Sequence, residues 1–240
     1  MRLADHFNKK LYVYWKKTHK LNCSFFDLFE TNLSFVYKLP LDSSKIVYIH
    51  LAKAKIYNWE VPKGFAKLYP DKSGEAIDFE YNRIPKHLQK EYLQYFNKLT
   101  PIKKIKRIVE KNSKKISKNT VGVHIRRTDF LKKYNIDIRK NNLKFMKIMD
   151  KMVKKNSSVN FFLATDCPDT ESLFKKKYRD RIFTYKKRSF SRANKKGMQD
   201  ALIDLLLLSK TRHILGSWRS TFTKVAWWFG KCKAKIDIII

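Results

Sequence analysis

The chain has 240 residues, of which 43% are hydrophobic and 14% aromatic. This composition excludes a disordered chain, and the length suffices for one large domain or two small ones. The formal net charge of +33 suggests a nucleic acid or another anionic partner. However, 42 of the 54 basic residues are lysines scattered along the chain. A solvated surface and a Lys-rich face that contacts anionic surfaces are therefore both open interpretations.

The first hundred residues predict an irregular α/β region. Strands are expected at 11–15 and 46–49, and Ser24 is expected to cap a short helix that ends at Phe29. A loop at 60–85 and a helix at 85–97 follow. We assign residues 1–100 to an incomplete N-terminal α/β domain.

Strands and helices alternate regularly from residue 101 onward. Pro101 is expected at the first position of a helix that carries Ile105 and Val109 inward. Strands are then predicted at 120–125, 159–164, 181–185, 212–215 and 235–240, and helices at 142–155, 168–177, 198–208 and 220–229. In the first of these helices, Leu143, Met146, Met149 and Val153 are expected to face inward.

This alternation predicts an α/β fold of right-handed βαβ units around a mainly parallel sheet. Because its strands are apolar on both faces, we expect helices on both sides of the sheet. We assign residues 101–240 to a Rossmann-like domain.

Several other classes of protein are disfavoured by what the sequence lacks. Three widely spaced cysteines argue against a disulfide scaffold and favour a reducing compartment. No stretch reaches the roughly 18 apolar residues of a membrane span, and no signal-peptide core is present. The sequence has no paired metal-ligand spacing, P-loop, G-x-G-x-x-G or Asp-x-Asp pattern. We therefore expect a cytoplasmic protein with no integral membrane segment, no metal and no cofactor.

The first candidate ligand-binding segment directly follows the strand at 120–125. In an open α/β sheet, ligands bind beyond the carboxyl ends of the strands. There the chain reads His124, Ile125, Arg126, Arg127, Thr128, Asp129. The alternation of a strand places His124 and Arg126 on one face and Arg127 on the other. Guanidinium groups bind phosphate through paired hydrogen bonds and keep their proton. We predict that one arginine binds an anionic ligand and that Asp129 braces the other, with a purely structural pair as the alternative.

Two further strand ends carry polar residues. Asp166 either caps the helix that begins at Pro168 or accepts hydrogen bonds from a base such as guanine, which has a donor at N1 where adenine has none. The segment from Gly216 to Phe222 forms either an ordinary helix cap or an anion site at a helix N-terminus. Together with the arginine pair, this segment predicts a diphosphate site, with these ligand-binding candidates: Ser217, Ser220, Thr221 and Phe222.

These three segments resemble, in order and spacing, motifs of the α1,2-, α1,6- and protein O-fucosyltransferases, including the nodulation fucosyltransferases. Val-Gly-Val-His-Ile-Arg-Arg-Thr-Asp at 121–129 resembles their His-x-Arg-Arg-x-Asp motif. Phe-Leu-Ala-Thr-Asp at 162–166 resembles the second motif, and Leu-Leu-Ser and Ser-Thr-Phe within 205–226 resemble the third. The likeness covers residues 105–235.

The resemblance implies a two-domain GT-B fold, GDP-fucose as donor, a glycan or glycoconjugate acceptor, and metal-independent transfer with inversion. It implies that residues 101–240 bind the nucleotide sugar and that residues 1–100 lie on the acceptor side. By position, it implies that Arg126 contacts the β-phosphate and that His124 and Asp166 hold the guanosine. Ser220, Thr221 and Phe222 would complete the phosphate and base pocket. Arg127 and Asp129 would support the site.

The sequence departs from this family pattern in two places. Related enzymes open with a glycine-rich strand and turn, whereas here no glycine precedes Gly64. An inverting transfer also needs a base, and the glutamate that α1,6-type enzymes carry after the arginine pair is absent. Asp137 is the nearest carboxylate and our candidate base. Three functions stay open: a fucosyltransferase, a shortened and inactive GDP-binding remnant, and a basic nucleic-acid-binding protein.

Overall fold

The computed structural model describes residues 12–15, 17–19, 21–36, 86–128, 137–218 and 220–240. The strand predicted at 46–49 and the loop at 60–85 lie outside these residues. The chain separates into two compact units: Met1–Lys16 with Asn32–Phe96, and Lys17–Thr31 with Asn97–Ile240. The boundary drawn between residues 100 and 101 stays a prediction.

In the first unit the structure describes two short strands and one helix. Strand β1 (Tyr12–Tyr14) pairs in parallel with β3 (Ser34–Val36). Helix α3 spans Lys86–Asn97. The strand predicted at 11–15 and the helix predicted at 85–97 are thus confirmed.

The second unit begins with residues 17–31, whose last strand pairs with the residues just before the long helix at 103–113. Ser24 caps the 3-10 helix η1 (Phe25–Asp27), which ends before Phe29 because Phe29 enters β2 (Phe29–Glu30). Strand β2 pairs antiparallel with β4 (Thr100–Pro101). The prediction that Pro101 begins a helix is wrong, because this pairing and the bond from the Ile102 N–H to the Leu28 carbonyl hold the chain extended. Helix α4 (Lys103–Ser113) begins two residues later.

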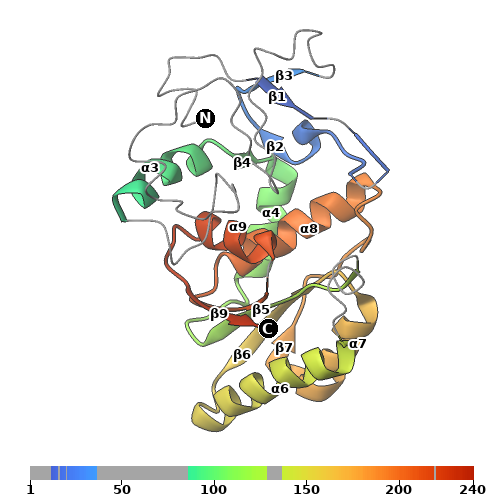
Figure 1. The fold of residues 1–240 in the computed structure, drawn as a ribbon, viewed down its shortest axis with the longest axis vertical. Helices are drawn as coiled ribbons and strands as arrows, with labels where there is room; N and C mark the ends of the chain where they lie inside the picture. The colour runs from blue at the N-terminus through green and yellow to red at the C-terminus, as the bar shows by residue number, and fades with distance from the viewer. Residues whose placement is uncertain (1–11, 16, 20, 37–85, 129–136, 219) are drawn as a thin grey trace, which may run out of the picture. The chain divides into compact units, whose positions relative to one another are not determined.

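The centre of the second unit is a parallel five-stranded sheet in the order β7-β6-β5-β8-β9, as the alternation predicts (Figure 1). Adjacent strands are in parallel register; for example, Ile125 pairs with Thr165, and His124 pairs with Gly216. The strands are β5 (Thr120–Ile125), β6 (Asn160–Thr165), β7 (Ile182–Phe183), β8 (His213–Ser217) and β9 (Lys235–Ile239).

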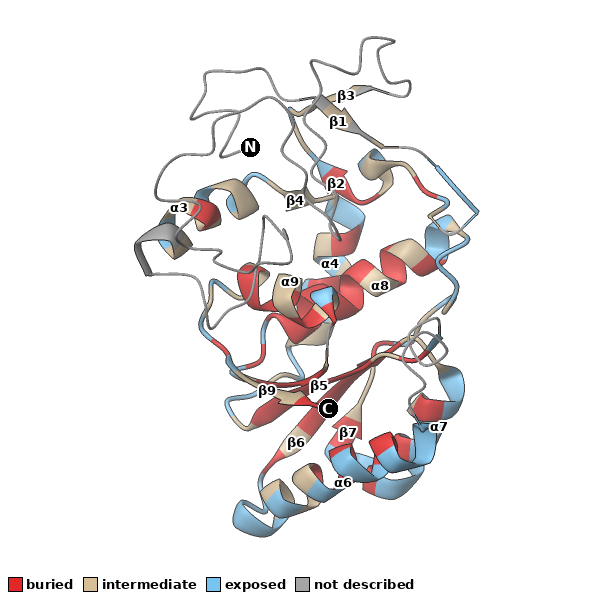
Figure 2. Cartoon of the chain, viewed as in Figure 1, coloured by how far each residue is buried: buried red, intermediate tan, exposed pale blue. Residues whose placement is uncertain are grey.

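Helices cover both faces of this sheet, and the buried residues concentrate between the layers (Figure 2). Helices α6 (Ile138–Lys155) and α7 (Pro168–Tyr178) pack on the face that carries Val123 and Ile125. Helices α8 (Lys195–Leu208) and α9 (Thr221–Phe229) lie on the opposite side (Figure 1). Within the described chain, no helix is both long and apolar enough to cross a membrane.

Glycine lets α9 approach the sheet closely. A Cβ built on Gly216 would lie 2.6 Å from Cγ2 of Thr223. Because no side chain is there, the first turn of α9 packs directly against the end of β8. This contact brings Phe222 and Thr223 beside His124 of the neighbouring strand.

Helix α6 differs from its prediction at the start. It begins at Ile138, four residues earlier than predicted, because the Asp137 side chain caps its backbone N–H groups. Leu143 is 63% exposed, so its predicted inward position is wrong, whereas Met146 and Met149 are buried as predicted. The inward face of the first turns is occupied instead by Asn141 and Asn142, which bind a buried arginine.

Candidate functional site

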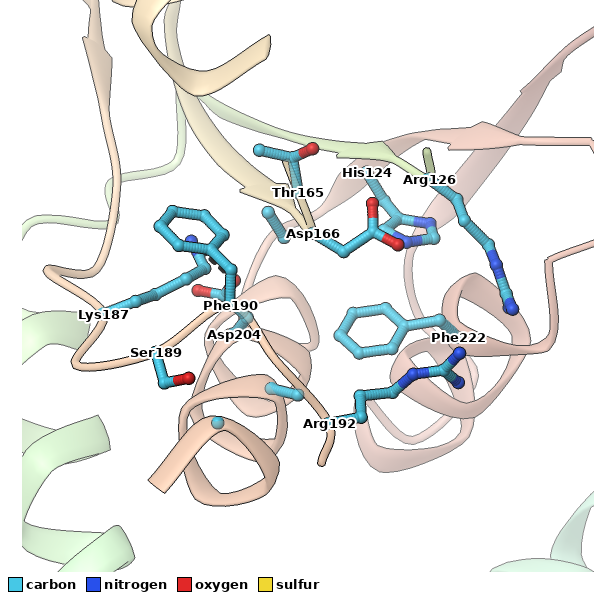
Figure 3. Close-up of a pocket in the computed structure, with 13 residues that line it drawn as sticks. His124, Arg126, Thr165, Asp166, Lys187, Ser189, Phe190, Arg192, Asp204 and Phe222 are labelled. Atoms are coloured by element: carbon cyan, nitrogen blue, oxygen red, sulfur yellow. Dashed lines mark ion pairs between the residues drawn. The ribbon is translucent and has the colours of Figure 1, made fainter. Parts of the chain in front are cut away.

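A cavity lies at the carboxyl ends of the central strands, where an α/β sheet is expected to bind its ligand (Figure 3). Its walls come from β5, β6, the loop between β7 and α8, and helices α8 and α9. Four of the predicted ligand-binding residues line it together: His124, Arg126, Asp166 and Phe222.

His124 forms an aromatic wall of the cavity. Its Nδ1 lies 2.8 Å from the Thr223 hydroxyl oxygen, and its ring stacks on Phe222 with centroids 4.6 Å apart. Burial and the neighbouring Arg126 and Arg127 lower the pKa of His124 to about 3. The imidazole is therefore neutral at physiological pH and contributes a flat surface and hydrogen bonding instead of charge.

The two adjacent arginines point to different places. Arg126 is partly exposed and lines the cavity. Arg127 is buried, and its guanidinium donates to the Arg126 carbonyl at 3.0 Å, to the Asn141 amide oxygen at 3.0 Å and to the Asn142 amide oxygen. Burial lowers the pKa of Arg127 to about 10, so it still carries its charge at neutral pH. Asp129, its predicted brace, lies outside the described residues.

Asp166 joins the ends of two strands. One carboxylate oxygen accepts from the Arg127 N–H at 2.7 Å, and the other accepts from the Thr128 hydroxyl at 2.6 Å. Helix α7 has Cys167 at its N-cap, without a side-chain hydrogen bond. The capping role considered for Asp166 is therefore wrong, because its carboxylate is directed to the end of β5.

The hydroxyl groups predicted for the diphosphate site do not line the cavity. Ser217 bridges β8 and β5, and Thr221 is exposed at the first turn of α9. Ser220 occupies the N-cap of α9, where its buried Oγ has no hydrogen-bond partner among the described residues. Binding of the donor by these three residues stays a prediction.

Asp137 lies beside the arginine pair. It lines a second hollow together with Arg126, Arg127, Lys140 and Trp218. The Asp137 carboxylate accepts from the Lys140 N–H at 3.0 Å, and this bond lowers the pKa of its fully exposed carboxyl. The residue is therefore ionised at neutral pH, but its low pKa makes it a weak base.

Sequence reasoning missed the loop between β7 and α8, which supplies Lys187, Ser189, Phe190 and Arg192 to the cavity. This loop is anchored on Asp200, a fully buried residue of α8. The Asp200 carboxylate accepts from the Arg188 side chain at 2.6 and 2.9 Å, and from the backbone N–H groups of Arg188 and Ser189 at 2.6 and 3.1 Å. Strand β7 ends at Phe183, short of the residue 185 predicted.

Asp204 of α8 is the second feature missed, and it lines the same cavity. Its Oδ2 lies 2.9 Å from the Lys187 ammonium, while its buried Oδ1 finds no hydrogen-bond partner within the part of the chain that the structure describes. Burial raises the pKa of Asp204 to about 7. The signal for it is a single charged residue within the apolar run at 201–208.

Phe222 separates two ends of the cavity. In Figure 3, Asp204 lies on one side of its ring, and the guanidinium groups of Arg126 and Arg192 lie on the other. One end of the cavity thus has a hydrogen-bond acceptor, the Asp204 carboxylate, and the other end has the guanidinium groups of Arg126 and Arg192. Among the described residues, no group of three or more His, Cys, Asp or Glu is placed to hold a metal ion.

The fold is an α/β fold of the GT-B fucosyltransferase type, as expected from the motifs. It is similar to that of the NodZ α-1,6-fucosyltransferase co-crystallised with GDP, with a TM-score of 0.53, 16% identity, and coverage of 94% of this chain and 83% of that chain. NodZ from Bradyrhizobium gives 0.53 at 15% identity, with coverage of 94% and 84%. NodZ soaked with GDP-fucose gives 0.51 at 16% identity, with coverage of 95% and 85%. No family model and no curated protein matches the sequence itself.

Proposed function

We propose that this chain binds GDP-fucose in the cavity and transfers the fucosyl group, with inversion and without a metal ion, to a glycan or glycoconjugate acceptor. The observation that carries the proposal is that one cavity is lined both by Asp204, which has a carboxylate oxygen without a partner among the described residues, and by the cationic side chain of Arg126. A purine nucleoside diphosphate has the complementary ends, because its base offers N–H donors and its phosphates are anionic.

The guanine base is assigned to the end that holds Asp204. The N1–H and 2-amino groups of guanine are adjacent donors, and a carboxylate oxygen aligned with them forms charge-assisted hydrogen bonds. Phe222 and the neutral ring of His124 offer flat aromatic surfaces beside it. Asp166 is the residue that the sequence predicts for this contact. Its two oxygens already accept from the backbone N–H of Arg127 and the hydroxyl of Thr128, which makes Asp204 the better acceptor.

The diphosphate is assigned to the end that holds Arg126 and Arg192. Transfer breaks the bond between the sugar C1 and the β-phosphate oxygen, so negative charge develops on the leaving GDP. A fixed guanidinium group stabilises that charge without itself giving up a proton. The backbone N–H groups at the start of α9 provide a second source of positive potential.

Asp137 is the candidate base. In the transfer it would take the proton of the acceptor hydroxyl as that oxygen bonds to C1 from the face opposite GDP. Its place in the hollow next to Arg126 supports this role. Its low pKa predicts only modest base strength, so the leaving group must supply much of the driving force.

The test is turnover of GDP-fucose, followed as GDP release against a panel of glycan acceptors. The proposal predicts acceptor-dependent release that falls at least about 100-fold in Asp137→Asn, the lower range for loss of a general base. Asp169→Asn, an exposed carboxylate in the first turn of α7, is the matched control and should keep full activity. GDP binding without any turnover would instead identify a nucleotide-binding remnant.

A further inference from the structure

A buried ion cluster of three residues lies against the cavity. Lys187 places its ammonium 2.9 Å from Oδ2 of Asp204 and 3.1 Å from Oε2 of Glu171. The side chains of Lys187 and Asp204 are each 4% exposed, and that of Glu171 is 13% exposed. Glu171 belongs to α7 and Asp204 to α8, so Lys187 connects helices on opposite faces of the sheet.

The cluster leaves one acceptor open. Glu171 is fully engaged, because its Oε1 also accepts from the Lys175 ammonium at 2.6 Å and from the Thr184 hydroxyl at 3.0 Å. Asp204 receives only the Lys187 ammonium on Oδ2, while its buried Oδ1 stays without a partner in the described chain. A buried carboxylate with an unfilled oxygen is costly unless a ligand donates to it.

We propose that Lys187 is a positioning residue that favours the ionised form of Asp204 and orients it, so that its free oxygen selects a guanine base over an adenine base. The inference rests on the proposed function, since it concerns the base of the same nucleotide. An ionised carboxylate attracts the N1–H and 2-amino donors of guanine, whereas it repels the N1 lone pair of adenine. Without the ammonium, a carboxyl group this deeply buried would hold its proton and lose most of that preference.

Lys187 and Glu171 must therefore act on Asp204 in opposite directions. The ammonium favours the ionised form of Asp204, and the nearby Glu171 carboxylate disfavours it. Asp200 of the same helix also disfavours ionisation, although it is paired with Arg188. His124 faces the cavity as a neutral ring. Three other charged groups line the cavity with Asp204: Arg126, Asp166 and Arg192.

The experiment measures GDP affinity by calorimetry between pH 5.5 and pH 9 for the full chain and three variants. Because every variant meets the same ligand, titration of the phosphates cancels in the comparison. In Lys187→Met the midpoint of the pH profile should move upward by about one unit, so affinity near pH 7 falls about fivefold and recovers in part at high pH. In Glu171→Gln, which leaves the cavity wall intact, the midpoint should move downward. Lys187→Arg keeps the charge and should restore the parent profile.

The second measurement is the preference of each variant between two nucleoside diphosphates. The preference for GDP over ADP, which has a lone pair at N1 and no 2-amino group, should shrink in Lys187→Met at pH 7 and stay unchanged in Lys187→Arg. If Lys187→Met instead loses GDP affinity equally at every pH, and neither the midpoint of its pH profile nor its nucleotide preference changes, the inference is overturned and Lys187 has only a structural role. If Lys187→Met does not fold, an unmoved or upward midpoint in Glu171→Gln overturns it as well. Absence of GDP binding in the parent chain would refute the proposed function instead.

Discussion

Ser217 fixes the direction in which Arg126 leaves its strand. The Ser217 hydroxyl oxygen accepts from the Arg126 N–H at 2.9 Å, and the same hydroxyl donates to the His124 carbonyl at 3.1 Å. The buried Ser217 side chain of β8 therefore hydrogen-bonds the backbone at the end of β5. This backbone lies between His124, which forms the aromatic wall of the cavity, and Arg126, which contributes to its cationic end. Ser217 acts on the site through Arg126 without lining the cavity itself.

Ser217→Ala should destabilise the chain by about 1 to 3 kcal/mol, because it leaves the buried His124 carbonyl and the Arg126 N–H without this partner. Urea unfolding measures the change. Ser157→Ala, at an exposed turn, should stay within about 0.5 kcal/mol of the parent chain. Equal stabilities of the two variants would show that the bridge between β5 and β8 is unimportant.

Asn142→Ala tests the support of Arg127. The variant removes one amide oxygen from a buried guanidinium, and a hydrogen bond to a charged group contributes roughly 1.5 to 3 kcal/mol. The adjacent Leu143 is a matched control, since it is 63% exposed and Leu143→Ala should change the free energy of unfolding by less than about 0.5 kcal/mol. If Leu143→Ala destabilised the chain more than Asn142→Ala, Leu143 would face the core, as the sequence pattern predicts, and the structure of α6 would be contradicted.

The ligand-free chain should lose stability as pH rises through about 7 because of Asp204. Its folded-state pKa is raised from 3.8 to about 7, so the folded state binds the proton more tightly than the unfolded state does. This contribution is fully present below pH 3.8 and is lost as Asp204 ionises. Asp204→Asn should remove it, so the stability of the parent relative to the variant should decline between pH 5 and pH 8 in chemical denaturation. A flat difference would contradict the assignment.

The His124 ring should stay neutral throughout the ordinary pH range. Its pKa is lowered to about 3 by burial and by the two arginines, so its NMR signals should not shift between pH 8 and pH 5. His124→Asn identifies those signals by their disappearance. A titration near pH 6.5 would mean that the ring is open to solvent and that the cavity wall is not as described.

How far the sequence leads can be judged from particular residues. The alternation of apolar strands and helices was enough to predict the parallel sheet. The rule for strand ends led to His124, Arg126 and Asp166, and the helix start that follows β8 led to Phe222; all four line the cavity. Lys187 and Arg192 escaped prediction because they belong to an irregular loop whose path is set by contacts distant in sequence. The backbone N–H of Asn22 donates to the Arg192 carbonyl at 3.3 Å, and Asp200 holds Arg188.

Long-range contacts also explain the errors. Pro101 has the properties of a helix start, but pairing with β2 holds it in a strand. Leu143 belongs to an apolar stripe in the sequence, yet the buried charge of Arg127 takes Asn141 and Asn142 inward and rotates Leu143 to the surface. In both cases a partner outside the local segment decides the outcome, and the periodicity of that segment does not report the partner.

The most direct test of the central claim is calorimetric titration of the chain with GDP, in the parent and in Arg126→Ala. The account predicts binding in the parent and a loss of roughly tenfold or more in the variant, as expected for removal of a charge-assisted contact to phosphate. Arg212→Ala, an exposed arginine just before the amino end of β8, should bind like the parent. Equal affinity of Arg126→Ala and Arg212→Ala for GDP, or no binding by the parent at millimolar GDP, would contradict the account.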